Sequence, residues 1–347
     1  MVIETNVTKM LGIKHPIIAA PMGPFYTTEL TVAVSEAGGL GVLSHTGLIG
    51  KDPEEEMKKN MEYVIEHTDK PFGFNIRTSR MEPYADILCY EIPKFIMENS
   101  KIKEQCVYAL TSAGSAKTLP NSKPFQKLKE SGSPIKHFHV APALWLAEKC
   151  VVAGVDGLVV TGGEGGGHQS YEKVSTLVLL QQMAKKLPDI PKIACGGFAT
   201  GEGVAAALSL GAGAVAMGSR FIASIESEFH NMYKKVIPPA AAQDTLLVTG
   251  FLGPIRLWKN DYSLHHDLVS DKEEKMAQEA ALDPDELLKI ARAYELAYEG
   301  NVNDGAVLLG QSIGLIDSVE SISEILEKIM KDAEAAVKNA ASLVKCS

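Results

Sequence analysis

The chain has 347 residues, of which 46% are hydrophobic, so it is long enough to form one large domain with a sizeable core. Its 34 Lys and Arg residues against 43 Asp and Glu residues give a formal net charge of −9. No basic block could follow a phosphodiester backbone, which argues against nucleic acid as a partner. The start, MVIETNVTKMLGI, lacks the features of a signal peptide, and no run of about 18 apolar residues occurs. We therefore expect a cytoplasmic protein that does not bind membranes.

The five cysteines are scattered and form neither a CxxC pair nor a cluster with histidine at metal-ligand spacing. Neither a disulfide framework nor a metal site is expected from this pattern. Cys195 stands beside Gly196 at the end of an apolar run, and a buried thiol is favoured there over a nucleophile.

Eight short apolar runs bounded by turns predict buried parallel strands. They are residues 17–20, 41–44, 72–76, 106–110, 137–141, 157–161, 193–195 and 214–217. Helical patterns separate them at residues 28–37, 53–67, 84–98, 124–130, 143–153, 174–187 and 202–210. Alternation of strands and helices favours a parallel α/β fold, and the count of eight favours closure into a (β/α)8 TIM barrel.

The pattern changes after Phe221. Residues 222–304 show no convincing strand and hold a long loop at 237–270, followed by helices. One of these helices is expected to begin at Asp283, with Pro284 in its first turn. We predict a mainly helical insertion after the eighth strand, which would lie over one mouth of a barrel formed by residues 1–221 and 305–347.

The last helix is predicted from a capping box at Ser321 and Glu324. One apolar face follows, made of Ile322, Ile325, Leu326, Ile329, Ala333, Ala336, Val337 and Ala340. This face is expected to complete the outer ring of helices or to meet a second subunit in a homodimer.

Residues 192–221, KIACGGFATGEGVAAALSLGAGAVAMGSRF, contain two successive strands that end in Gly196-Gly197 and Gly218-Ser219. Glycine lets the backbone approach a ligand closely, and free amides at a helix N-terminus attract anions. The last two strands of a TIM barrel are the usual place of its phosphate site. Two such turns in succession favour a phosphate group over ordinary turns.

His168 follows the predicted sixth strand, after the stretch Thr161-Gly-Gly-Glu-Gly-Gly-Gly. A backbone so rich in glycine could lie flat against a planar ligand while the histidine projects over it as a general base. A flexible loop with a solvent-facing histidine is the alternative. The stretch is not a P-loop, because no GKS or GKT follows.

Other strand ends supply further candidates. Pro21 and Met22 could press against a flavin edge, although an apolar plug is the alternative. Asn75 suits a flavin or a substrate, and a loop cap remains open. In the insertion, a packed or solvated loop is favoured over a lid for Trp258, Tyr262, His265 and His266.

At these residues the sequence closely resembles the FMN-dependent nitronate monooxygenase family, formerly called 2-nitropropane dioxygenases. That family also contains flavin-dependent enoyl-acyl-carrier-protein reductases and NADH:quinone reductases. The resemblance runs nearly end to end and is carried by PIIAAPMG, TTELTVAVSEAGGLGVLS, GFNIR, GGEGGGHQS, residues 192–221 and GAVLLGQSIGLID. It implies a TIM barrel that holds FMN non-covalently at its mouth.

The resemblance also implies roles for individual residues. His168 falls on the family's catalytic histidine, and no metal is implied. The implied FMN-binding residues are Pro21, Met22, Gly23 and Asn75 toward the ring system, Thr161 and Gly166 in the middle, and Gly196, Gly197, Ala216, Met217, Gly218 and Ser219 toward the phosphate.

The chain departs from the family pattern close to the histidine. Gly165 replaces an alanine, Gln169-Ser170 follow His168, and Thr161 stands where many members have glutamine. Ser219 replaces the common threonine and keeps the hydroxyl. The departures near His168 would lie against substrate and flavin, so they leave the substrate open.

The leading hypothesis from the resemblance is an enzyme that oxidises alkyl nitronates with O2 to carbonyl compounds and nitrite. His168 would deprotonate a nitroalkane or stabilise its anion. Alternatively, the same scaffold could take a hydride from NAD(P)H and pass it to an enoyl thioester or a quinone. A carrier protein would then need a basic patch, for which Lys259, Arg256 and Arg77 are candidates, although the sequence shows no cluster.

Two further readings rank lower. The stretch 196–219 also resembles the phosphate-binding segment of IMP dehydrogenase, but no cysteine follows the sixth strand in a suitable loop. A flavin-binding protein without turnover is the last alternative.

Overall fold

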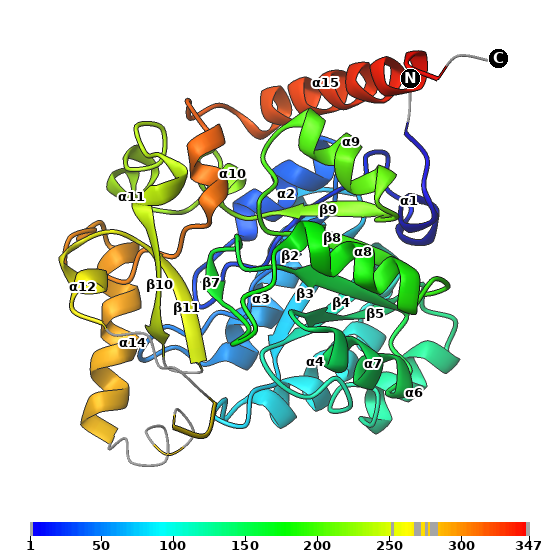
Figure 1. The fold of residues 1–347 in the computed structure, drawn as a ribbon. Helices are drawn as coiled ribbons and strands as arrows, with labels where there is room; N and C mark the ends of the chain where they lie inside the picture. Colours follow the sequence, from blue (N-terminus) through cyan, green and yellow to red (C-terminus); the bar gives the residue numbers. More distant parts are fainter. Residues whose placement is uncertain (1–2, 251–252, 267–271, 275–276, 278–283, 345–347) are drawn as a thin grey trace.

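Eight parallel strands form one sheet in the order β1-β9-β8-β6-β5-β4-β3-β2. The structure is a computed structural model that describes residues 3–250, 253–266, 272–274, 277 and 284–344. A bridge between Ile18 and Leu40 joins the two edge strands, so the sheet closes into a barrel (Figure 1). The predicted (β/α)8 barrel is confirmed. Its strands are β1 (Ile17–Ala19), β2 (Gly41–Leu43), β3 (Phe72–Arg77), β4 (Cys106–Ser112), β5 (Lys136–Ala141), β6 (Gly157–Thr161), β8 (Lys192–Cys195) and β9 (Ala214–Met217).

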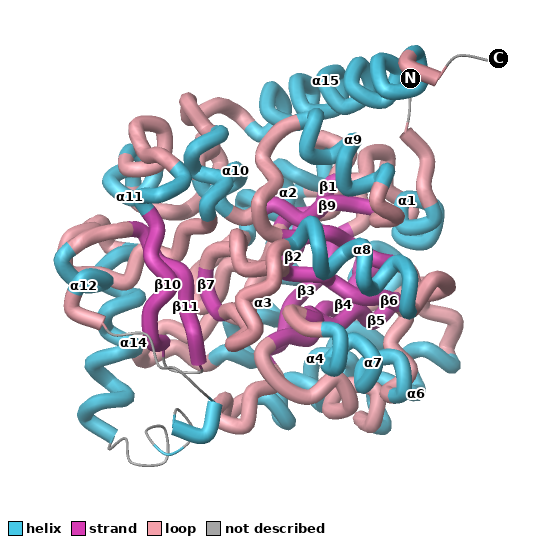
Figure 2. Tube along the Cα trace, viewed as in Figure 1, coloured by secondary structure: helices cyan, strands magenta, loops and turns pink. Residues whose placement is uncertain are grey.

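Helices surround the strands, as Figure 2 shows. The predicted helices are confirmed to within two residues at each end: α2 (Thr28–Glu36), α3 (Pro53–His67), α4 (Ala85–Glu98), α6 (Lys123–Glu130), α7 (Leu144–Val152), α8 (Thr176–Lys186) and α9 (Gly201–Ser209). Local sequence explains their ends. The Asp52 carboxylate accepts hydrogen bonds from the amides of Glu54 and Glu55, and Pro53 occupies the first turn of α3. The structure adds two short helices, α1 (Asn6–Leu11) and α5 (Ser100–Gln105).

Large side chains fill the inside of the barrel. The rings of Tyr108 and Phe138 lie 5.1 Å apart between their centroids, and both side chains are buried. A Cβ on Gly73 would come within 2.6 Å of the Tyr108 ring, and one on Gly157 within 2.1 Å of the Phe138 ring. Glycine is therefore needed on both neighbouring strands. The barrel interior is a packed core, which leaves the strand ends for a ligand.

The last helix, α15 (Ile322–Ser342), packs on α9 and α2. Its predicted capping box is confirmed, since Ser321 Oγ accepts from the Glu324 amide at 3.3 Å and Glu324 Oε2 accepts from the Ser321 amide at 3.0 Å. The apolar face is buried as far as Ala333, whereas the Val337 side chain is 42% exposed. The helix thus completes the outer ring over its first half (Figure 1). A second subunit against the remainder stays a prediction.

The insertion contains a β-hairpin that sequence reasoning missed. Strands β10 (Thr245–Gly250) and β11 (Gly253–Trp258) pair antiparallel, and β11 also pairs with β7 (Gly167–His168). The prediction that residues 222–304 hold no strand is wrong. Pro254 lies inside β11 and weakened its strand signal, because proline cannot donate to a ladder hydrogen bond. The predicted start at Asp283 lies outside the described residues. The other elements are α10 (Ser219–Ile222), α11 (Asn231–Lys235), η1 (Ala242–Asp244), α12 (Asp261–Leu264), α14 (Pro284–Tyr298) and η2 (Gln311–Leu315).

Aromatic rings attach the insertion to the barrel. Phe25, next to the β1 end, stacks on Tyr298 of α14 with centroids 4.8 Å apart and meets Phe229 edge-on at 5.1 Å. Phe229 belongs to the same buried cluster as residues of the barrel's helices. Among the described residues, no helix is both long and apolar enough to span a bilayer.

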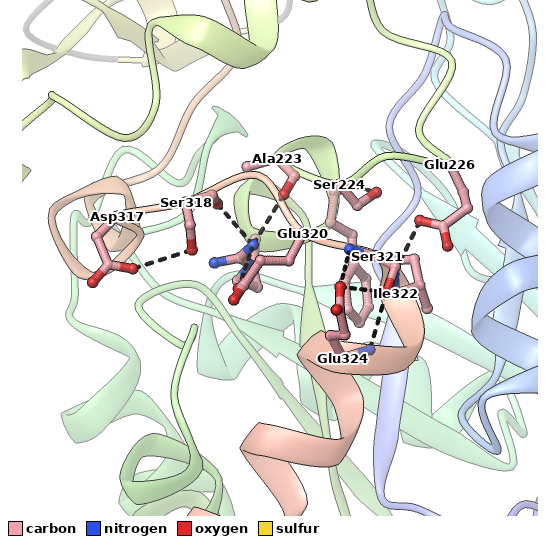
Figure 3. A network of polar contacts seen from close by, with 11 residues as sticks. Ala223, Ser224, Glu226, Asp317, Ser318, Glu320, Ser321, Ile322 and Glu324 are labelled. Carbon is pink, nitrogen blue, oxygen red and sulfur yellow. Dashed lines mark hydrogen bonds and ion pairs between the residues drawn. The ribbon is translucent and has the colours of Figure 1, made fainter.

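Polar contacts fix the chain where it leaves β9 and where it returns to α15 (Figure 3). Arg220 donates hydrogen bonds to the carbonyl oxygens of Ala223 and Ser318, both at 3.0 Å, and lies 3.6 Å from the Glu320 carboxylate. Burial lowers the pKa of Arg220, and the neighbouring carboxylates oppose that shift. The returning segment therefore holds the short helix that follows the Gly218 turn.

Candidate active site

A cavity of about 1180 Å³ opens at the carboxyl ends of the barrel strands. Ligand sites in TIM barrels occupy this end. The predicted residues that line it are Pro21, Met22, Gly23, Asn75, Thr161, Gly166, His168, Gly196, Gly197, Ala216, Gly218 and Ser219. Met217 does not line it, because its side chain is 1% exposed and packs in the hydrophobic core behind the strand. Their roles in binding stay predictions.

The wall formed by the ends of β8 and β9 consists of backbone and small side chains. Gly196 and Gly197 both have φ of 89°, a conformation that favours glycine. A Cβ on Gly218 would find no atom nearer than Ala20 Cβ at 3.8 Å, so the absence of a side chain there leaves open space. Ser219 Oγ accepts a hydrogen bond from the Gly310 amide at 3.0 Å, which links this wall to the returning segment. Such a wall fits a phosphate-bearing group.

His168 lies in a strand rather than in a loop. In the ladder with β11, His168 is opposite Ile255 and Gly167 is opposite Arg256. The amide of Gln169 donates to the Pro254 carbonyl at 2.7 Å. The His168 side chain is exposed and lines the cavity. The flexible-loop alternative is therefore wrong for Gly167 and His168, because a paired strand holds their backbone.

The glycine-rich stretch before His168 is fixed by hydrogen bonds. Arg256 Nε donates to the Gly163 carbonyl at 2.8 Å, and Gln169 Nε2 donates to the Gly165 carbonyl at 2.8 Å. Glu164 Oε2 accepts from the Thr176 amide at 2.8 Å. Burial lowers the pKa of Arg256, and the nearby Glu164 carboxylate opposes that shift. Arg256 thus supports the loop and is not part of an exposed basic patch.

The opposite side of the cavity contains Asn75, which is 2% exposed. Its Nδ2 donates to the Leu110 carbonyl at 3.2 Å and to Ser112 Oγ at 3.1 Å, so neighbouring strand ends hold the amide in place. Arg77 also lines the cavity and forms an ion pair with Glu82 at 2.8 Å. This side therefore combines a fixed amide with a paired cation.

Cys195 lines the cavity between β6 and Gly196. Burial raises the pKa of its thiol to about 11, although hydrogen bonds from Thr161 and Gly196 oppose the shift. The thiol stays neutral near pH 7 and is a poor nucleophile. This agrees with the prediction of a buried thiol. In the described part of the chain, no group of three or more His, Cys, Asp or Glu side chains could hold a metal ion.

The cavity also reaches residues that sequence reasoning missed. It continues to Lys117 after β4, to the α7 residues Trp145 and Lys149, and to Lys272 of the insertion. An exposed tryptophan and lysine just after the fifth strand are the signal that could have found them. The suggested lid residues Trp258, Tyr262, His265 and His266 are not among the described residues that line the cavity.

The fold and the site define a TIM-barrel enzyme whose cavity fits a phosphate-bearing cofactor beside a histidine. The chain belongs to the nitronate monooxygenase family, whose model, described as "Nitronate monooxygenase", matches residues 4–332. With this membership it is a flavin-dependent oxidoreductase.

Three similar proteins mark the range of the family. The structure of FabK from Thermotoga maritima has a TM-score of 0.80 and 32% identity, over 99% of this chain and 100% of that one. A curated relative from Rhodococcus jostii (strain RHA1) is 28% identical over 95% of this chain and 96% of its own length. It is named "(3aS,4S,5R,7aS)-5-hydroxy-7a-methyl-1-oxo-octahydro-1H-indene-4-carboxyl-CoA dehydrogenase". A "Probable nitronate monooxygenase" from Staphylococcus aureus (strain JH9) is 30% identical over 73% of this chain and 77% of its own.

Proposed function

We propose that the protein is an FMN-dependent reductase of unsaturated acyl thioesters that takes its electrons from NAD(P)H. The observation that carries this proposal is the extent of the cavity. Its volume, about 1180 Å³, exceeds the range of about 300–1,000 Å³ that is usual for one small-molecule ligand. A cofactor and a second extended ligand can therefore share it.

The residues around the cavity fit FMN. The small-residue wall at Gly196, Gly197, Gly218 and Ser219 leaves room for a phosphate beside backbone amides. When bound, FMN supplies reversible two-electron chemistry, since it can accept a hydride from one substrate and return it to another.

His168 is the residue that would move a proton. A thioester whose β-carbon receives a hydride must also gain a proton at its α-carbon, and an imidazole at the cavity can supply it. The pairing of β7 with β11 holds the His168 backbone. A fixed backbone helps to keep the imidazole within reach of one carbon atom.

Two of the relatives support a thioester. The Rhodococcus jostii protein is named for a CoA-linked substrate, and this chain matches almost its whole length. The match to FabK likewise covers nearly all of both chains. Neither comparison identifies the acyl group.

Oxidation of an alkyl nitronate with O2 is the second candidate function. The family's own description and the Staphylococcus aureus relative favour it. In that reaction His168 would take a proton from the carbon that bears the nitro group, or stabilise the resulting anion. A small nitronate would use only the part of the cavity near the strand ends.

Anaerobic mixing of the flavin-loaded protein separates the two reactions. In the proposed function NADH or NADPH bleaches the flavin absorbance, and an enoyl thioester then restores it without O2. Nitronate oxidation predicts bleaching by an alkyl nitronate alone and none by either nicotinamide nucleotide. The second result would overturn the thioester proposal.

A further inference from the structure

The main cavity extends beyond the barrel mouth along one face of α7. Trp145, Glu148, Lys149 and Val152 all line it. Their spacing of three, one and three residues places them on one face of the helix. This face is open to solvent, since the Trp145 side chain is 43% exposed and Val152 is 82% exposed. A ligand that lies along α7 can therefore still reach the barrel mouth.

Two lysines converge on the indole ring of Trp145. Lys149 Nζ lies 4.8 Å from the ring centroid, and Lys272 Nζ, which comes from the insertion, lies 5.6 Å from it. Trp145 Nε1 donates to Glu172 Oε1 at 2.7 Å, which fixes one edge of the ring. Two ammonium groups at one ring repel each other, and an anion bound between them would relieve that repulsion.

A third lysine borders the same part of the cavity. Lys117 follows β4, is exposed, and lines the cavity together with Lys149 and Lys272. The carboxylates here are Glu148 and Glu172, and the second is hydrogen-bonded to the indole. The three lysines therefore leave an excess of positive charge beside an aromatic ring.

This combination matches a ligand that carries both phosphates and a flat ring. Lysine ammonium groups bind phosphate oxygens as point charges, and an indole face stacks on a planar base. We propose that Trp145, Lys149, Lys272 and Lys117 form a subsite for an adenine nucleotide diphosphate. Both acyl-CoA and NAD(P)H contain this group. The reactive end of either ligand would lie toward His168, and that part of the inference rests on the proposed function.

Binding can be measured without turnover. Calorimetric titration of the flavin-loaded protein with ADP should show saturable binding that weakens as salt is added. Trp145→Leu, and Lys149→Gln combined with Lys272→Gln, should each raise the dissociation constant by about tenfold or more. Lys185→Gln is the matched control, because Lys185 is an exposed lysine on α8 outside the cavity lining. Flavin absorbance shows whether each variant stays folded and loaded.

Two results would overturn the subsite. One is a wild-type protein that binds no ADP, and the other is ADP binding that Trp145→Leu and the double lysine variant leave unchanged. ADP binding with no turnover of any thioester would instead reject the proposed function and retain the subsite. The two failures are thus distinguishable.

Kinetics identify the source of the nucleotide. If acyl-CoA occupies the subsite, the variants raise KM for acyl-CoA and leave KM unchanged for the same acyl group on pantetheine and for NAD(P)H. If NAD(P)H occupies it, they raise KM for NAD(P)H alone. Unchanged KM for all of these substrates would contradict the inference.

Discussion

His168 lies opposite Ile255 in an antiparallel ladder, so a strand of the insertion holds the backbone of the candidate catalytic histidine. The next pair in the ladder joins Gly167 to Arg256, whose guanidinium also donates to the Gly163 carbonyl. The insertion therefore does more than cover the barrel mouth. It fixes the glycine-rich segment whose sequence by itself would allow many conformations.

Replacement of His168 tests its proposed role directly. His168→Ala is expected to lower turnover by about 10²–10⁴-fold, the usual contribution of a general acid or base, while flavin content stays at the wild-type level. Turnover with the preferred substrate and the flavin-to-protein absorbance ratio are the measurements. Wild-type turnover with every candidate substrate would remove His168 from the mechanism.

Arg256 is predicted to be a positioning residue. Arg256→Met removes the hydrogen bonds to the Gly163 carbonyl and to Thr245 Oγ1, and is expected to cost about 1–3 kcal/mol of unfolding free energy. Because the glycine-rich segment would then shift, kcat should fall with little change in flavin content. Arg256→Lys should restore part of kcat, and urea unfolding at matched pH gives the stability change.

A control for Arg256 comes from Arg292 on α14. Arg292 forms ion pairs with Glu295 and Glu299 at the surface. Arg292→Met should leave kcat unchanged, since exposed ion pairs contribute little. An equal loss of kcat in both arginine variants would show that the effect of Arg256→Met is a general loss of stability.

Space at Gly218 is predicted to be needed by the flavin. A single methyl group in Gly218→Ala would lie 3.8 Å from Ala20 Cβ, which is an ordinary contact. The larger Gly218→Val side chain would extend into the cavity. We expect nearly normal flavin content in the alanine variant and a loss of about tenfold or more in affinity for the valine variant. Full flavin occupancy in Gly218→Val would place the cofactor elsewhere.

Stability is expected to fall on mild acidification. Thr111 Oγ1 lies 2.8 Å from His137 Nε2 and 2.7 Å from His139 Nδ1 in a buried cluster. Burial lowers the pKa of His137 to about 3 and that of His139 to about 4, from 6.5. Between pH 6.5 and about 4 the unfolded chain binds protons that the folded chain does not. Each histidine then costs about 1.4 kcal/mol per pH unit at most.

Urea midpoints at pH 7, 6 and 5 measure this dependence. The double variant His137→Gln with His139→Gln removes both titrating groups and should flatten the profile, even if it lowers stability at pH 7. His67 is an exposed histidine, and His67→Gln is the matched control that should keep the wild-type slope. An unchanged slope in the double variant would contradict the assignment.

The local patterns around the barrel were sufficient to predict its strands. Ile193 to Cys195 and Ala214 to Met217 are short apolar runs with glycine after them, and both form buried strands of the barrel. Such strands are apolar on both faces and need no knowledge of their neighbours. The same glycines identified the wall at β8 and β9. The hairpin of β10 and β11 was missed because Pro254 breaks its local pattern.

The sequence alone determined the barrel, the family and the position of His168 at a strand end, because these depend on residue periodicity, glycine placement and contiguous motifs. The tertiary structure decided what meets at the cavity. Pairing of His168 with Ile255 joins residues far apart in the chain, and so does the approach of Lys272 to Trp145. Such contacts depend on how an insertion folds back over the barrel, and no local pattern encodes that return.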